Sequence, residues 1–162
     1  MQLLSKRTAR VASVAALAFG GVMYAPAAHA TANAASDYCT GYKLIASYPV
    51  KTSGGTSYGT TYLYWKESSG FNCAVAVKNA AGGAGTKDYM SVALTACKET
   101  KPKSTCEESD DIYSSSEDGD NYANYAGWVQ VHTGKGHCVK LDAVIWKHNT
   151  FAQFSSGAFH CD

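Results

Sequence analysis

Four histidines are the residues of this chain best suited to catalysis. His132, His137, His148 and His160 could act as general bases beside an acid such as Asp142, with a serine as nucleophile. A serine nucleophile is normally marked by a G-x-S-x-G turn, which the chain lacks, and no H-E-x-x-H zinc motif occurs either. Because no histidine stands in a recognised motif, the sequence predicts surface or turn histidines and no enzyme.

An acidic stretch at 107–120 is the strongest local charge pattern. It reads E-E-S-D-D at 107–111 and E-D-G-D at 117–120. Oxygen ligands this close together could hold Ca²⁺, which takes about six to eight of them. The spacing does not follow the D-x-[DN]-x-[DN]-G pattern, however, and acidic loops rich in serine are commonly just solvated. The sequence therefore favours a solvated loop, and it predicts no metal and no other cofactor.

The cysteines predict disulfide bonds. Their number is even, and they are Cys39, Cys73, Cys97, Cys106, Cys138 and Cys161. Zinc sites need short paired spacings such as C-x2-C, whereas eight residues separate the closest pair here, Cys97 and Cys106. Those two bracket a Lys-Pro-Lys-Ser turn and are expected to close a local loop. The sequence alone leaves the other pairings open.

Residues 1–30 have the organisation of a secretory signal peptide. A basic start at 6–10 precedes an apolar run at 11–28, and A-H-A at 28–30 is a small-x-small cleavage site. The run is short for a membrane-spanning helix and is interrupted by glycine and proline. We therefore expect a secreted protein, in which disulfides are the rule, with one domain at 31–162.

The charge of this domain excludes two classes of partner. Residues 31–162 hold eleven lysines and arginines against thirteen acids, a net charge of −2. The basic residues are scattered and form no basic face of the kind that nucleic acids or anionic membranes require. We expect neither nucleic-acid binding nor membrane insertion, and the oligomeric state stays open.

The domain has the pattern of an all-β protein. Segments rich in Val, Thr and aromatic residues, separated by Gly, Ser and Asn turns, predict strands at 42–47, 56–65, 72–78, 89–98, 122–132 and 138–146. Alternation predicts one apolar face for each strand. In the last four of these segments, in order, that face holds Cys73, Val75 and Val77; Met90, Val92 and Leu94; Val129 and Val131; and Val139, Leu141, Ala143 and Ile145. Such strands predict a small antiparallel sandwich or a partly open barrel, stabilised by disulfides. The tail from 149 onwards is expected to pack back on it.

Three tryptophans suggest an alternative function, that of a carbohydrate-binding module. Exposed aromatic planes on a sheet can stack on sugar rings, and Trp65, Trp128 and Trp146 lie in predicted strands. Aromatic residues are also ordinary strand formers, so packing within or between strands is the competing interpretation.

A third class is an extracellular protease inhibitor. The loop at 98–105 lies between two cysteines, as a braced inhibitory loop would, and Lys101-Pro102 or Lys103-Ser104 would be the residues offered to the protease.

Short motifs in a fixed order resemble a known family. They are CTGYKLI at 39–45, YLY at 62–64, GFNCAV at 70–75, YAG at 125–127, GHCV at 136–139 and HCD at 160–162. Together with the cysteine frame they resemble the spore-associated protein A family of actinobacteria, over nearly the whole of 31–162. Cys39, Cys73, Cys138 and Cys161 match the family frame, whereas Cys97 and Cys106 are additional. Trp128 stands where the family usually has proline.

The resemblance implies a small secreted β-rich protein found with aerial hyphae and spores, without established catalytic residues. Its expected partners are cell-wall or spore-surface components. The positions of the four shared cysteines lead us to expect Cys39 bonded to Cys161 and Cys73 bonded to Cys138, which leaves Cys97 for Cys106. The sequence therefore predicts a non-catalytic protein of the cell, hypha or spore surface.

Overall fold

The fold is all-β, as expected. The computed structural model describes residues 35 and 37–161, so the expected signal peptide at 1–30 lies outside the described residues. Within these residues, eight strands form one antiparallel sheet in the order β5-β4-β7-β8-β1-β2-β3-β6. The strands are β1 (Lys43–Lys51), β2 (Ser57–Lys66), β3 (Phe71–Lys78), β4 (Asp88–Ala96), β5 (Ser115–Tyr122), β6 (Tyr125–His132), β7 (Val139–Lys147) and β8 (Thr150–Ser155). No helix in the described part is long and apolar enough to cross a membrane.

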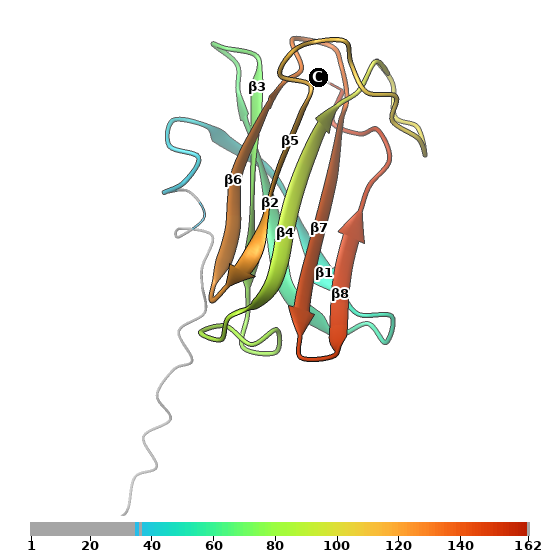
Figure 1. Ribbon diagram of the computed structural model, residues 1–162. Helices are drawn as coiled ribbons and strands as arrows, with labels where there is room; N and C mark the ends of the chain where they lie inside the picture. The colour runs from blue at the N-terminus through green and yellow to red at the C-terminus, as the bar shows by residue number, and fades with distance from the viewer. Residues whose placement is uncertain (1–34, 36, 162) are drawn as a thin grey trace, which may run out of the picture.

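The sheet bends on itself into a nearly closed barrel with two facing layers (Figure 1). Strands β5, β4, β7 and β8 make one layer, and β1, β2, β3 and β6 make the other. Among the described residues, one backbone ladder pair, Lys51 with Gln153, joins β1 to β8. The core between the layers includes Leu63, Met90, Val92, Leu94, Val129, Val131, Leu141 and Ile145. The alternation predicted for β4, β6 and β7 is therefore confirmed, and the barrel is partly open at the β1–β8 seam.

A side-chain hydrogen bond joins the two edge strands of the sheet. Strands β5 and β6 stand at opposite ends of the strand order but follow each other in the chain. The Asp118 carboxylate on β5 accepts from the backbone N–H of Gly127 on β6 at 2.6 Å and from the Tyr122 hydroxyl at 2.7 Å. One carboxylate thus connects the two edge strands where no backbone ladder does.

Strand β3 is buried on both faces. Ala74 and Ala76 point into the main core, whereas Cys73, Val75 and Val77 form a second cluster on the outside of the barrel. The segment at 37–42 covers that outer face, held by the Cys39–Cys73 disulfide. The expectation of a single apolar face was wrong for β3. Because the segment FNCAVAV is apolar at both alternating positions, periodicity cannot say which face points inward.

Two strands were not predicted. Strand β5 is mostly polar, with acids at 117, 118 and 120, and the short β8 lies in the expected tail. The predicted strand at 122–132 is divided, since β5 ends at Tyr122 and β6 begins at Tyr125. Both missed strands gain their order from ladder pairing with a neighbour, β5 with β4 and β8 with β7, which hydropathy does not report.

The expected pairing of the four shared cysteines was wrong. The structure bonds Cys39 to Cys73 and Cys138 to Cys161, whereas the local bond between Cys97 and Cys106 is as predicted. The β7–β8 hairpin returns the chain beside its own start, and the backbone of Phe159 pairs with that of Val139. This return places Cys161 next to Cys138.

One lysine is buried inside the fold. Lys78, at the end of β3, is 1% exposed. Its ammonium donates to the backbone carbonyls of Thr86 at 3.2 Å, Asp88 at 3.1 Å and Tyr122 at 2.8 Å. Loss of water around the ammonium lowers the pKa of Lys78. The three carbonyls replace that water and link β3, β4 and β5.

Candidate functional site

His132 is paired with an acid, but not with the one suggested by the sequence. Its Nδ1 lies 3.0 Å from Asp111, and its ring lies 5.0 Å from that of Phe71. The backbone N–H of Tyr113 and then the His132 ring hold the pKa of Asp111 below its usual range. The pair lies in a shallow, open surface depression with Tyr113 and Ile112.

His137 and His160 lie at the same small cavity. The cavity measures about 30 Å³ and is lined by Ile45, Trp65, Asn72, Thr133, His137 and His160. His160 Nε2 lies 2.8 Å from the Tyr48 hydroxyl. This space holds about one water molecule and is too small for an organic substrate.

The remaining candidates for catalysis lie apart from these histidines. His148 is exposed in the β7–β8 turn. Asp142 on β7 accepts from the Ser155 hydroxyl and pairs with the Lys140 ammonium at 2.9 Å. The structure thus brings Asp142 to a serine and a lysine rather than to a histidine. The Ser155 hydroxyl donates to Asp142, so the arrangement at this serine is not the serine–histidine pair suggested by the sequence.

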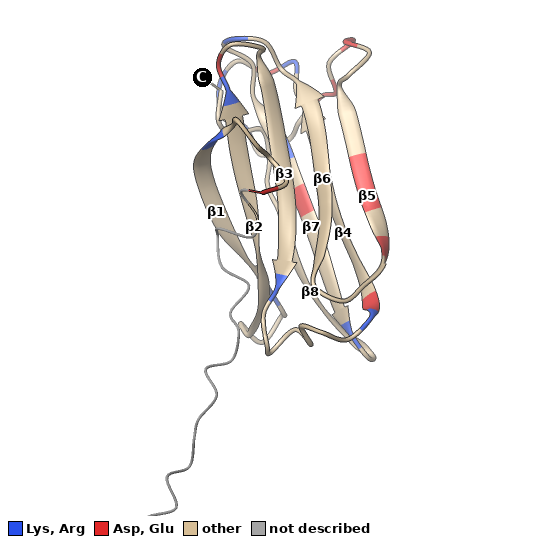
Figure 2. Ribbon diagram, turned by 90° about the vertical axis from the view of Figure 1, so that its left-hand side faces the viewer, with Lys and Arg blue, Asp and Glu red and all other residues tan. Residues whose placement is uncertain are grey.

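The acidic stretch does not converge on one point. Glu107 and Asp110 pair with Lys98, Glu108 accepts from the Ser114 hydroxyl, and Asp111 pairs with His132. The acids of β5 lie along the strand in Figure 2, and Asp118 there is engaged by β6. The carboxylates of 107–120 therefore act as separate local contacts.

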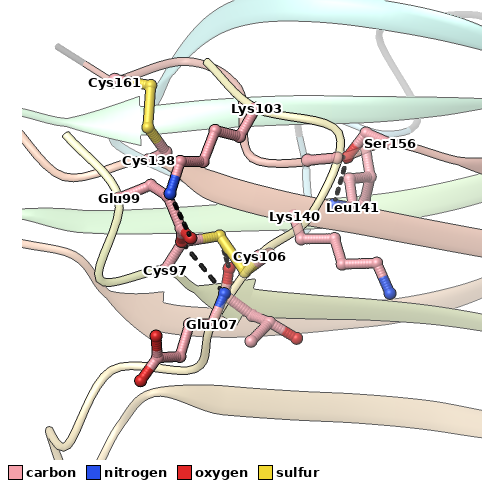
Figure 3. Close-up of a disulfide and its surroundings, with 12 residues drawn as sticks. Cys97, Glu99, Lys103, Cys106, Glu107, Cys138, Lys140, Leu141, Ser156 and Cys161 are labelled. Carbon is pink, nitrogen blue, oxygen red and sulfur yellow. Dashed lines mark hydrogen bonds and ion pairs between the residues drawn. A yellow bond between two sulfur atoms is a disulfide. The ribbon is translucent and has the colours of Figure 1, made fainter. Parts of the chain in front are cut away.

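The loop closed by Cys97 and Cys106 is braced from within (Figure 3). Glu99 pairs with Lys103 at 3.7 Å and accepts from the backbone N–H of Glu107 at 3.0 Å. Of the described residues, Cys97, Glu99 and Cys106 are the ones close enough to share a metal ion, but both sulfurs are consumed in the disulfide. This group is therefore structural.

The same loop contacts the C-terminal tail through its backbone. The backbone N–H of Lys103 donates to the carbonyl of Ala158 at 3.0 Å. At Gly157 the tail passes so close that a side chain would overlap the Lys103 carbonyl oxygen. The backbone of Lys103 is thus already engaged, whereas Lys101 and Pro102 are exposed.

The three tryptophans do not form one platform. Trp65 is half-buried beside the small cavity described above. Trp128 is 54% exposed on β6, and Trp146 is 37% exposed on β7, in the other layer. Trp146 has an aromatic neighbour, because Phe151 stands opposite it on β8 with ring centroids 5.2 Å apart. Of the predicted residues, only Trp146 belongs to an exposed pair of rings.

A groove lies beside that pair, where the β1–β8 seam meets the turns. It has a volume of about 590 Å³ and the following lining: Lys51, Thr52, Ser53, Gly54, Thr56, Tyr58, Asn149, Thr150, Phe151 and Gln153. One wall is the β1–β2 turn, and the other is the start of β8. The Tyr58 hydroxyl and Thr150 Oγ1 lie 2.9 Å apart and connect the two walls. We call this feature the seam groove.

Sequence reasoning missed the seam groove. The turn at Ser53-Gly54-Gly55 was recognisable, and Phe151 was visible in the expected tail. Their proximity depends on β8 reaching β1 across the sheet order, through the single pair of Lys51 with Gln153. A local sequence pattern cannot predict a pairing between residues so far apart in the chain.

Comparison with known proteins gives one informative similarity. The chain is 34% identical over 142 residues to Spore-associated protein A of Streptomyces coelicolor, a match that covers 85% of this chain and 78% of that protein. No family model matches the chain, and no solved structure matches it. The similarity therefore comes from a whole-length relative rather than from an isolated motif.

Proposed function

Because this chain belongs to the spore-associated protein A family, we propose that it is a non-catalytic secreted protein acting at the surface of the hypha or spore. The main support for this proposal is the similarity, along most of both chains, to a protein whose name associates it with spores. All six cysteines are in disulfides, which suits an oxidising, extracytoplasmic setting. The predicted signal peptide at 1–30 would deliver the chain there.

The arrangement of polar side chains supports the absence of catalysis. In the described part of the chain, none of His132, His137 and His148 is hydrogen-bonded to a serine or threonine hydroxyl. The acid nearest to a serine, Asp142, is paired with Lys140. Hydrolysis by covalent catalysis requires a nucleophile hydrogen-bonded to a base. These residues do not form such a pair.

Localisation in the producing organism tests this proposal. Antibodies against the purified protein should label intact spores and aerial hyphae, and the protein should appear in the salt wash of whole spores. A chain lacking residues 1–30 is the control and should stay in the cytosol. Detection of the full chain only in the cytosol, with six free thiols, would refute the proposal.

A further inference from the structure

We propose that the seam groove binds an uncharged polysaccharide chain, with Phe151 as the ring on which a sugar stacks. This inference rests on the proposed surface role, for which it supplies a means of attachment. It concerns a site different from the one the three tryptophans suggested, because two of those tryptophans lie away from the groove.

The groove is shaped before any ligand arrives. In the β1–β2 turn, the backbone N–H of Thr52 donates to the carbonyl of Thr56 at 2.9 Å, and that of Gly55 donates to the carbonyl of Thr52 at 2.9 Å. Thr56 N–H also donates to the Thr52 hydroxyl at 3.2 Å. A volume of about 590 Å³ is within the usual range of ligand pockets, about 300–1,000 Å³. A fixed groove loses little conformational entropy when a ligand binds.

The lining matches the hydrogen-bonding chemistry of sugars. Ser53, Asn149 and Gln153 line the groove, and within the described residues their side chains make no hydrogen bond with the protein. Hydroxyl and amide groups can both donate and accept, which is what a chain of sugar hydroxyls requires. Several unengaged neutral groups therefore face one open space.

The aromatic pair supplies an apolar surface beside these polar groups. Phe151 is 46% exposed and lines the groove, and Trp146 next to it is 37% exposed. Their planes are inclined by 31°, so the exposed surface continues from the groove onto β7. The C–H face of a pyranose packs on such a ring while its hydroxyls reach the neighbouring polar groups.

The same lining disfavours other occupants. Lys51 is the only charged residue of the groove, so a phosphate polyanion would find one cation. Phe151 and Tyr58 are its only large apolar side chains, too few for the row of pockets that anchors an apolar peptide. An uncharged chain rich in hydroxyl groups is the best match.

Pull-down with insoluble glycans tests the inference on the purified, disulfide-bonded protein. Chitin, cellulose and peptidoglycan are used in separate arms, and the arm that retains the protein identifies the source of the sugar chain. We expect Phe151→Ala to weaken retention about tenfold, with a smaller loss for Gln153→Ala. Trp128→Ala is the matched control, since it removes an exposed aromatic ring from the other layer, and it should bind like the wild type. Unfolding midpoints of all variants verify that each one is folded.

The outcomes separate this inference from the proposed function. Retention by none of the three glycans, or equal retention of the wild type and a folded Phe151→Ala variant, would overturn the seam groove as a polysaccharide site. Loss of retention in Trp128→Ala but not in Phe151→Ala would also overturn it. Surface labelling of spores in each of these cases would leave the proposed function intact.

Discussion

Lys78 shows how a charged residue can be part of the core of this protein. Its ammonium is surrounded by three backbone carbonyls from the 86–88 segment and the end of β5. A buried charge is tolerated only when hydrogen bonds replace its water, and the carbonyls in turn need a donor. The residue is therefore a structural cation that joins three strands, and it has no access to a substrate.

Replacing Lys78 with methionine should destabilise the protein by about 2–3 kcal/mol, because the carbonyls would lose their donor while the volume is nearly kept. Urea unfolding monitored by tryptophan fluorescence measures this loss. Lys147→Met is the control, since Lys147 also donates to a carbonyl, that of Ala81, but does so at the surface. Equal stability of the two variants would contradict the structural role of Lys78.

At the scale of elements, the disulfides fix segments that the sheet alone would not hold. The Cys39–Cys73 bond spans 34 residues and fastens the segment at 37–42 to β3, whereas the Cys97–Cys106 bond spans nine residues within one loop. In the chain-entropy model a larger closed loop restricts the unfolded chain more. The first bond should therefore matter more to stability than the second.

We expect the paired change Cys39→Ala and Cys73→Ala to cost about 4 kcal/mol of unfolding free energy, and Cys97→Ala with Cys106→Ala about 2.5 kcal/mol. Urea titration of the oxidised proteins gives both values. Non-reducing peptide mapping of the wild type provides the control for connectivity and should recover a peptide joining Cys39 to Cys73. A larger loss for the Cys97 and Cys106 variant would reverse this order.

The hydrogen bond between Tyr122 and Asp118, both on β5, gives stability a dependence on alkaline pH. The hydrogen bond to Asp118 raises the pKa of Tyr122 to about 12 from 10.0. The neutral phenol is the donor, so its contribution is complete below about pH 10 and is lost as the pH rises through about 12. Tyr122→Phe should be less stable than the wild type at neutral pH, and the difference should vanish near pH 12.

Urea unfolding of the two proteins at neutral pH and at about pH 11, where the deficit of Tyr122→Phe should already be smaller, checks this expectation. Tyr113→Phe is the control, because Tyr113 is 56% exposed and its hydroxyl makes no hydrogen bond within the described residues. It should match the wild type at both pH values. If the stability difference between Tyr122→Phe and the wild type stayed constant with pH, the hydrogen bond from Tyr122 to Asp118 would not contribute to stability.

The strands that the sequence predicted are those rich in apolar and aromatic residues, whereas β5 and β8 gain their order from pairing with a neighbouring strand. Val129 with Val131, and Leu141 with Ile145, alternate clearly, and they lie in the core as predicted. Strand β5 offers no apolar face, and its order comes from the ladder with β4. The seam groove and the Cys39–Cys73 bond likewise join segments distant in the chain, which no local pattern encodes.

At the scale of the whole molecule, the purified protein should show no hydrolysis of peptide, ester or glycan substrates above a heat-inactivated control. The physical reason is that Asp142 lies apart from His132 and from the small cavity that His137 and His160 share. Chromogenic substrates of each class provide the measurement. Reproducible turnover that disappears in His132→Ala, His137→Ala, His148→Ala or His160→Ala would prove the prediction wrong and identify the site.

The single pair that joins β1 to β8 also bears on how the chain reaches its native state. Lys51 and Gln153 are about one hundred residues apart, so closing the seam joins the first of the described strands to the last. Closing so long a loop early is entropically costly, and topologies rich in distant pairs fold slowly. The β1–β8 seam is thus one of the contacts of the barrel that cost the most chain entropy to close.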